Sequence, residues 1–349
     1  MGVRERVARL LHRGGGLTAV QLAKAWRPPR SIAVLTYHHV CDPRSDYRYD
    51  PDVADVTPAQ FRRHMLLVRR YCNPIDLDKL VSALDGGSLP PNPCLITFDD
   101  GYRSNLTEAL PILRELNLPA TFFIATGFAT HRRLYWWDRI AYLVAKATGP
   151  AIRVTYPQPM TIGLGDRAAA RAALVKVVKD HRELDLERFL VEVAAGAGVA
   201  WARDRERALA DELIMTWDEI RSLAAAGMTI ESHSRDHRVL ETMTPAALAD
   251  DLRGARDELE RELGKPSRAI AYPVGRSIAR YPAVHGAIAE AGYQLGFTNA
   301  SGVIDLRRRA ELDRLDLARL AVDRDLSDAM FVAQLVIPRL AYSRPSSIT

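Results

Sequence analysis

The sequence predicts an α/β fold of repeated β-α units with a helical insertion. Short apolar runs alternate with amphipathic helical patterns along most of the 349 residues. Several of these runs are apolar throughout, as expected of parallel strands that are covered on both faces. One long interval, residues 131–214, breaks the alternation. This length suits one large domain or two smaller ones.

Seven runs have the length and composition of strands. They lie at residues 32–37, 94–98, 120–125, 228–231, 268–272, 293–298 and 317–322.

Helical patterns fill the intervals between these strands. Thr57 and Thr244 are typical N-cap residues, and each precedes a proline that suits the first helical position. They predict helices over 58–71 and 245–263, and Gly264 is a suitable end for the second. Further helices are predicted at 103–117, 217–226 and 281–291.

Residues 131–214 are predicted to form a mostly helical insertion between the third and fourth strands. The interval contains a hairpin pattern at 151–164, with Pro157 and Pro159 at its turn, followed by stretches rich in Ala, Leu, Arg and Glu. The flanking segments 31–130 and 215–340 then form the two parts of the α/β domain, and 341–349 is a tail.

The formal net charge of +5 is concentrated at the N-terminus. Residues 1–30 hold seven basic groups and one acid, whereas the rest of the chain holds 41 basic and 42 acidic groups. Without excess positive charge, this larger part of the chain is poorly suited to neutralising the phosphates of a nucleic acid. The composition therefore argues against a nucleic-acid-binding protein.

Residues 1–30 also show an amphipathic pattern. Val3, Val7 and Leu10 are spaced for one helical face, and arginines lie largely elsewhere. Such a basic segment can lie on an anionic membrane surface. A helix packed on the protein, or a frayed tail, explains the pattern equally well.

The chain shows no sign of a membrane span or a signal peptide. No apolar run approaches the roughly 18 residues that a span requires. Cys41, Cys72 and Cys94 are widely spaced, which fits free thiols in a reducing compartment. We expect a cytoplasmic protein, with the basic segment able to place it at the inner face of the membrane.

Titratable side chains gather where the predicted strands end. The first, second and fourth strands are followed by His38 and His39, Asp99 and Asp100, and His233 and His237. The carboxyl ends of parallel strands meet at one edge of a barrel or sheet, so these side chains are expected to lie close together.

Each cluster has an ordinary structural explanation. Asp99–Asp100–Gly101 is a common turn sequence, and His233 and His237 could be a simple loop pair. Together, an aspartate and two histidines supply three ligands with an open position, which is how a hydrolytic divalent-metal site is built. The second aspartate is then free to act as a base.

Two motifs carry a family resemblance. ITFDDGY at 96–102 and SHSRDH at 232–237 resemble the first two motifs of the polysaccharide deacetylases, carbohydrate esterase family 4 with the NodB homology domain. AYPVG at 271–275 is a weaker match. The resemblance implies a TIM-like, distorted (β/α)7 barrel formed by 31–130 and 215–340, in agreement with the seven predicted strands.

The resemblance also implies roles for individual residues. Asp100, His233 and His237 would be ligands of a divalent metal, most often zinc, and Asp99 would be the general base. The backbone N–H of Tyr102 would stabilise the oxyanion formed from an N-acetyl group. Acetate and a free amine would be released.

The sequence departs from the usual family pattern in two places. Ala271 stands where the third motif has an arginine, and no histidine follows His285 to serve as the late general acid. A subgroup resembling the poly-N-acetylglucosamine deacetylases has permuted motifs, with this histidine on the first strand. VLTYH at 34–38 fits that pattern, so His38 is the candidate acid. His39 is the alternative, because adjacent strand residues point to opposite faces.

Other residues have weaker claims. Arg319 could orient Asp99 in place of the missing arginine, although a salt bridge or a solvated position is the more common role of such a residue. Tyr272 and Pro273 are expected to shape the groove wall.

Aromatic and acidic residues could complete the groove. Trp136 and Trp137 could stack on sugar rings, but aromatic residues of this kind are more often packed. The aspartates of loop 41–57 could line the rim, with solvated turn positions as the default: Asp42, Asp50, Asp52 and Asp55.

The leading hypothesis is a metal-dependent hydrolase that removes N-acetyl groups from a sugar or polysaccharide. One alternative is a non-catalytic glycan-binding protein on the same barrel. Another is a metal-dependent hydrolase of a different amide or ester. The combined set of Asp99, Asp100, His233 and His237 favours catalysis, because a binding protein has no evident need for the base.

Overall fold

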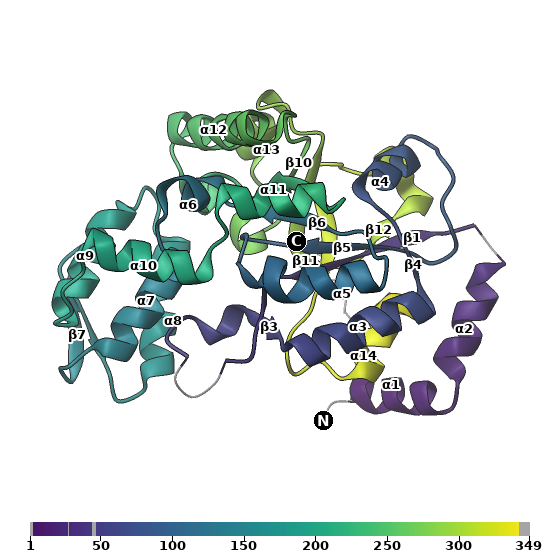
Figure 1. Ribbon diagram of the computed structural model, residues 1–349, viewed down its shortest axis with the longest axis horizontal. Helices are drawn as coiled ribbons and strands as arrows, with labels where there is room; N and C mark the ends of the chain where they lie inside the picture. Colours follow the sequence, from purple (N-terminus) through teal and green to yellow (C-terminus); the bar gives the residue numbers. More distant parts are fainter. Residues whose placement is uncertain (1–2, 27, 44–46, 342–349) are drawn as a thin grey trace.

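A computed structural model describes residues 3–26, 28–43 and 47–341. The predicted tail 341–349 lies outside these residues except for Ala341. Within them, seven parallel strands close into a distorted barrel, as the sequence predicted (Figure 1). Around the barrel the strands are β1 (Ser31–Tyr37), β5 (Pro93–Phe98), β6 (Thr121–Ile124), β9 (Thr229–Ser232), β10 (Ala269–Ala271), β11 (Leu295–Ser301) and β13 (Leu317–Ala321). β1 pairs with both β5 and β13, which closes the ring.

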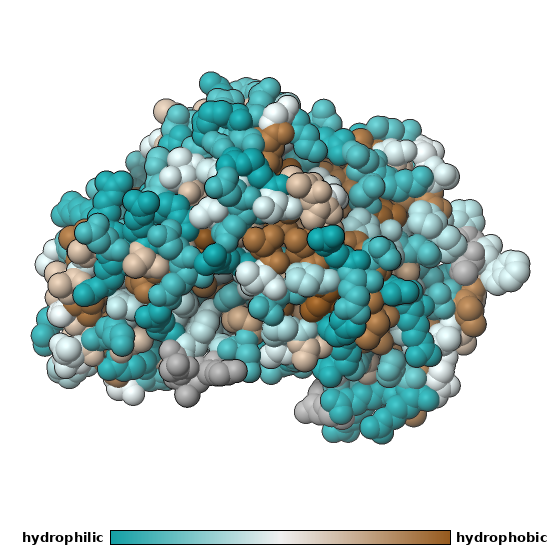
Figure 2. Space-filling view, in the orientation of Figure 1, coloured by the Kyte–Doolittle hydropathy of each residue, from teal (hydrophilic) through white to brown (hydrophobic). Residues whose placement is uncertain are grey.

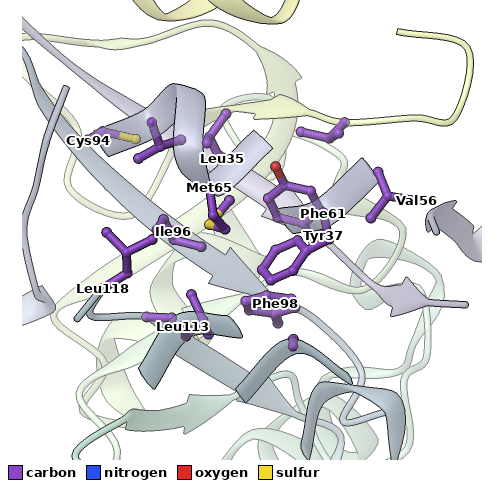
Figure 3. Packing of buried hydrophobic residues seen from close by; sticks show 14 of the residues in the cluster. Leu35, Tyr37, Val56, Phe61, Met65, Cys94, Ile96, Phe98, Leu113 and Leu118 are labelled. Atoms are coloured by element: carbon purple, nitrogen blue, oxygen red, sulfur yellow. The ribbon is translucent and has the colours of Figure 1, made fainter. Parts of the chain in front are cut away.

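Both faces of the barrel strands are buried. Side chains such as Val34, Leu95 and Phe297 fill the interior. Alternate residues point outward, where Tyr37 and Phe98 pack against Phe61 of the surrounding helical layer (Figure 3). This two-sided burial explains why the strand sequences are apolar throughout.

Helices cover the outside of the barrel. The main ones are α3 (Pro58–Tyr71), α4 (Leu77–Leu84), α5 (Leu110–Glu115), α11 (Trp217–Ala225), α12 (Pro245–Leu263), α13 (Pro282–Glu290) and α14 (Asp328–Val336). Thr57 caps α3 through the Gln60 N–H, and Gly264 ends α12 at a φ of 77° that favours glycine. Both predicted helices have the expected bounds.

The helix predicted at 103–117 is interrupted. Its first part, Asn105–Ala109, is a π-helix, and α5 begins only at Leu110. Pro111 has no N–H to donate into a continuous α-helix, which accounts for the break. Small elements that the sequence did not predict are β2 (His39–Val40), β3 (Ala54–Val56), β4 (Asn73–Pro74), β12 (Ile304–Asp305) and α15 (Pro338–Ala341).

The segment between β6 and β9 forms a body with its own apolar core at one end of the molecule (Figure 1). Its elements are α6 (Thr126–His131), α7 (Trp136–Lys146), β7 (Ala151–Val154), β8 (Met160–Gly163), α8 (Arg167–Asp180), α9 (Leu186–Gly196) and α10 (Arg203–Leu213). β7 and β8 form the hairpin expected at 151–164. Phe189 and Leu174 are fully buried in this core.

The N-terminal residues form two packed helices, α1 (Val3–Arg13) and α2 (Gly16–Ala25), at the opposite end of the molecule (Figure 1). Ala8 and Leu17 are buried in the same cluster as residues of α14, so the described part of this segment is not a frayed tail. None of the helices in the described ranges is both long enough and apolar enough to cross a bilayer.

Candidate active site

Three ligand-type side chains converge at the carboxyl end of the barrel. Asp100 follows β5, and His233 and His237 follow β9. The Nε2 atoms of both histidines lie 3.3 Å from Oδ1 of Asp100, and all three residues are buried. One donor atom from each can be chosen so that all lie within 4.8 Å of one another.

The protonation of His233 makes this group suitable for a cation. Its Nδ1 lies 2.8 Å from the carbonyl oxygen of Ala271, which can only accept a hydrogen bond, so Nδ1 carries the proton. In the neutral ring, Nε2 then presents a lone pair toward Asp100. Oδ1 of Asp100 is buried without a hydrogen-bond partner among the described residues. A divalent cation would resolve this close approach of electron-rich atoms, so the residues fit the implied metal.

The backbone around these ligands is unusual. Asp100, Ser234 and His237 have φ values of 73°, 61° and 48°, a region that non-glycine residues seldom occupy. Asp251 of α12 accepts hydrogen bonds from the N–H groups of Arg235 and Asp236, at 3.1 and 2.9 Å. Burial raises the pKa of Asp251 to about 6. This carboxyl therefore helps to hold the loop in its strained form, a role that the sequence did not reveal.

Asp99 is held on the inner side of the barrel by Arg319. The guanidinium donates two hydrogen bonds to the carboxylate, Nη1 to Oδ1 at 2.8 Å and Nη2 to Oδ2 at 2.6 Å. Both side chains are buried. Burial favours the neutral carboxyl, but the charge of Arg319 outweighs it and lowers the pKa of Asp99.

Of the two common roles of such an arginine, a salt bridge or a solvated position, the structure shows only the salt bridge. Arg319 is not solvated, since its relative exposure is 0%. It points inward because it continues the interior side of β13 from Leu317.

His38 approaches Asp99 from β1. Its Nε2 lies 3.9 Å from Oδ2 of Asp99, and its Nδ1 lies 3.0 Å from Oδ2 of Asp55. The backbone N–H of His38 donates to the same Asp55 oxygen. Burial alone would lower the pKa of His38, but the neighbouring carboxylates, chiefly Asp55, raise it to about 10. These carboxylates therefore favour the protonated form of the imidazole.

His39 lies outside this cluster. Its Nδ1 is 2.6 Å from the hydroxyl oxygen of Ser104, and its ring stacks on Tyr102 at 4.6 Å. Burial lowers its pKa to about 4. Of the two histidines, the structure places His38 beside Asp99, because side-chain direction alternates along the extended backbone.

A cavity of about 540 Å³ opens onto these side chains. Its inner wall contains His38, Asp99, Asp100, His233 and His237. The insertion supplies the outer wall through α8, with Arg171, Val175 and Lys179. The insertion is therefore part of the candidate site.

Loop 41–57 also contributes to the cavity, and its default interpretation as solvated turns is wrong in part. Asp50 and Asp55 are buried, because Arg171 pairs with Asp50 at 3.2 Å and His38 contacts Asp55. Asp50 and Asp52 line the cavity. Asp42 is exposed.

The predicted aromatic residues line the cavity, but their side chains are largely buried. Trp136 and Trp137 line the cavity, yet each is at least 95% buried, and Trp136 donates from Nε1 to the carbonyl of His237. Tyr272 lines the cavity and donates to the Leu315 carbonyl at 2.5 Å. Pro273 is buried and is not among the lining residues.

The side chain of Tyr102 is directed away from the cavity. Its hydroxyl donates to Oδ2 of Asp138 at 3.1 Å. Asp138 is fully buried, and burial raises its pKa well above the usual value. Sequence analysis did not identify Asp138, because nothing in its local sequence distinguishes it from a surface aspartate.

The polysaccharide deacetylase family model matches residues 86–153 and 173–296, which together make up more than half of the chain. The chain belongs to the polysaccharide deacetylase family. The matched segments contain Asp99, Asp100, His233 and His237, whereas His38 and Arg319 lie outside them.

Two relatives with named functions match very different shares of this chain. YxkH of Bacillus subtilis (strain 168), named as a polysaccharide deacetylase, is 22% identical over 295 residues, which cover 81% of this chain and 73% of YxkH. Poly-β-1,6-N-acetyl-D-glucosamine N-deacetylase of Escherichia coli (strain K12) is 29% identical over 103 residues, only 29% of this chain and 15% of that enzyme.

The barrel is also found in a solved structure, the Streptococcus pyogenes deacetylase PplD in complex with acetate. The TM-score is 0.57 at 17% identity, and the match covers 89% of this chain and 99% of PplD. At 17% identity this similarity is evidence for the fold of the present chain alone.

Proposed function

We propose that this protein is a metal-dependent hydrolase that removes N-acetyl groups from a sugar or polysaccharide and releases acetate and a free amine. The observation that carries the proposal is the placement of Asp99 and His38 on the wall of the cavity that also contains Asp100, His233 and His237. Family membership and the acetate bound by PplD support it.

Asp100, His233 and His237 would hold the metal, and their donor set suits zinc. A bound divalent cation polarises the amide carbonyl and acidifies water. Asp99 would take the proton of the attacking water, since Arg319 keeps its carboxylate ionised and fixed in direction. His38 would donate a proton to the departing amine.

The backbone of Tyr102 remains our candidate for contacting the acetyl oxygen. Tyr102 forms an antiparallel bridge with Ile214, and the bridging hydrogen bonds are made by the neighbouring residues: Arg103 N–H to Leu213, and Met215 N–H to Gly101. In such a pair the N–H of the central residue points away from the partner strand. The bridge therefore leaves this N–H unused, and we propose that it contacts the acetyl oxygen.

We place the chain near the poly-N-acetylglucosamine deacetylases with permuted motifs. Ala271 of β10 has no side chain that could bind Asp99. Arg319 binds Asp99 from β13 instead, and His38 approaches Asp99 from the end of β1. The match to the E. coli enzyme supports this placement.

The function is tested by incubating the zinc-loaded protein with N-acetylglucosamine oligomers of β-1,6 and β-1,4 linkage. We expect acetate and free amine in equal amounts, and loss of both after chelation. Metal and glycan binding without acetate release would favour the glycan-binding alternative. Release of a different acid from another amide or ester would favour the third hypothesis.

The link between Asp55 and His38 predicts a pH effect. In Asp55→Asn, burial should lower the pKa of His38, because the chief cause that raises it is removed. A proton donor with a lower pKa loses its proton at lower pH. The alkaline limb of the kcat/KM profile should therefore move toward neutral pH.

The control for this profile is Asp42→Asn, which alters an exposed aspartate of the same loop. Its profile should match that of the unaltered protein. An unchanged alkaline limb in Asp55→Asn would exclude His38 as the acid.

We propose that α1 and α2 bind an anionic membrane surface. Val3 and Leu10 on α1 are 76% and 72% exposed, and Trp26 after α2 is 90% exposed. On a helical wheel, Arg6 and Arg13 lie beside the Val3–Leu10 stripe. Figure 2 shows hydrophobic atoms on the outer side of α2. An apolar face flanked by arginines fits a layer of anionic headgroups.

This contact is measured by co-sedimentation with vesicles of phosphatidylcholine, with or without phosphatidylglycerol. We expect salt-sensitive binding only to the anionic vesicles, and a loss of roughly tenfold in Leu10→Ser/Trp26→Ser. Leu66→Ser, which alters a half-exposed leucine of α3, should bind normally. Equal binding by both variants would rule out this surface.

A further inference from the structure

A second cavity, of about 1000 Å³, lies between the insertion and the loop that carries His233 and His237. Six arginines line it, from α10, from the start of α7 and from the segments beside them: Arg132, Arg133, Arg139, Arg203, Arg207 and Arg235. The acidic residues of the lining are Glu187, Glu206 and Asp236. The lining therefore holds more basic than acidic side chains. Asp211 pairs with Arg132 and Arg207, and Asp250 pairs with Arg235, from outside the lining.

The deepest of these arginines is incompletely paired. Arg139 has a relative exposure of 1%, and its Nη1 contacts Glu187 at 2.9 Å. Its Nε and Nη2 are buried and have no hydrogen-bond partner among the described residues. Trp201 lies 4.8 Å from the guanidinium and holds it in place. Burying donor groups without acceptors is costly, so this arrangement indicates that an acceptor belongs here.

Other donors at the same cavity share this feature. Nε1 of Trp201 and Nε of Arg133 are also buried without a hydrogen-bond partner within the described part of the chain, and Nε of Arg235 has only a long ion-pair contact with Asp236, at 3.5 Å. All three residues line the cavity.

The beginning of α10 adds to the positive potential. This helix starts at Arg203 and has 11 residues, and no side chain accepts a hydrogen bond at its N-cap, Ala202. The first N–H groups of a helix attract anions through unsatisfied donors and the helix dipole. Trp201 and Arg203 line the cavity beside this end.

We propose that this cavity is a binding site for a phosphate group, separate from the metal site. Arginine matches phosphate oxygens with two parallel donors, and a phosphate dianion can accept from several guanidinium groups at once. A single carboxylate has two oxygens and one charge, which leaves more of these donors unpaired. The ligand is thus free phosphate or the phosphomonoester of a larger molecule.

The test is isothermal titration of the full chain with sodium phosphate and with glycerol 1-phosphate, at constant ionic strength set by sodium chloride. We expect saturable binding of at least one of them. Arg203→Gln/Arg207→Gln should weaken it by on the order of a hundredfold, because the variant loses two charge-assisted hydrogen bonds and each costs roughly tenfold in affinity. These side chains are near the protein surface, so the double variant is expected to fold.

Arg139→Met is a second variant. Its affinity for phosphate is compared with that of the unaltered protein once circular dichroism has shown that the variant folds. Arg188→Gln is the matched control, because Arg188 lies on α9 near Glu187 but is not among the residues that line the cavity. It should bind like the unaltered protein.

The two ligands distinguish the sources of the phosphate. Preference for glycerol 1-phosphate indicates a phosphomonoester, and preference for sodium phosphate indicates the free ion. Absence of saturable binding, equal loss in Arg188→Gln, or equally tight binding of acetate would overturn the proposal. The experiment measures phosphate binding and not acetate release, so a negative result does not contradict the deacetylase proposal.

Discussion

Asp99→Asn is expected to reduce kcat for acetate release by roughly 10²–10⁴-fold, the usual contribution of a general base. The asparagine retains the shape of the side chain and an oxygen that can accept a hydrogen bond from Arg319, but it cannot take a proton at neutral pH. The cluster of Asp100, His233 and His237 is unaltered, so the bound metal should remain. Metal content and kcat are measured on the same preparation.

Asp138→Asn is the matched control, since it also replaces a buried carboxyl near the site. Burial raises the pKa of Asp138 well above its usual value, so the charged form of this carboxyl is disfavoured and the substitution replaces a buried group of nearly the same shape. We expect a nearly normal rate. Full turnover by Asp99→Asn, with metal bound, would remove Asp99 from its proposed role.

Arg319→Met should destabilise the protein by about 3–5 kcal/mol, the typical cost of removing one partner of a buried ion pair. The methionine fills much of the space but leaves the carboxylate of Asp99 buried without its counter-charge. Urea unfolding measures the loss of stability. Acetate release should fall as well, because the pKa of Asp99 rises when Arg319 no longer lowers it.

The loss of stability should depend on pH in a defined direction. Arg319 lowers the pKa of Asp99 in the folded state, so the stabilisation is present above the unfolded value of 3.8 and is lost as pH falls below it. The difference between the unaltered protein and Arg319→Met should therefore be larger at pH 7 than at a pH well below 3.8.

A double variant separates the ion pair from simple packing. Asp99→Asn/Arg319→Met has no buried charge at this position and should recover much of the lost stability. Arg62→Met removes an exposed partner of Glu115 and should have little effect. If the double variant is as unstable as Arg319→Met, the loss comes from packing and not from the unpaired charge.

The sequence is most informative where chemistry and local structure coincide. Asp99 and Asp100 follow a buried strand directly, and their neighbouring positions place one on each side of the chain. His233 and His237 share one loop, and their approach to Asp100 follows from the pairing of β5 and β9 with β6, the strand that lies between them. The alternation of side chains along β1 likewise limits the candidate acid to one of two histidines.

Contacts between distant segments could not be predicted in this way. Asp55 reaches His38 because loop 41–57 folds back over the barrel, and Arg171 reaches Asp50 because the insertion packs on that loop. Asp251 holds the loop of His233 and His237 from the inner face of a long helix. No local pattern encodes these pairs, because Asp55, Arg171 and Asp251 each resemble an ordinary surface residue in the sequence.

The sequence by itself predicted the seven strands, five of the seven main helices and the residues that meet at the carboxyl end of the barrel, but not α4 or α14. These features depend on the periodicity of apolar side chains and on the direction of the strands, both of which can be read along the chain. Only the tertiary structure decided that His38 rather than His39 faces Asp99, that Arg319 is the buried partner of Asp99, and that the insertion forms one wall of the first cavity and part of the wall of a second one. The physical reason is that burial and charge pairing arise between segments far apart in sequence, and they exist only once those segments are packed together.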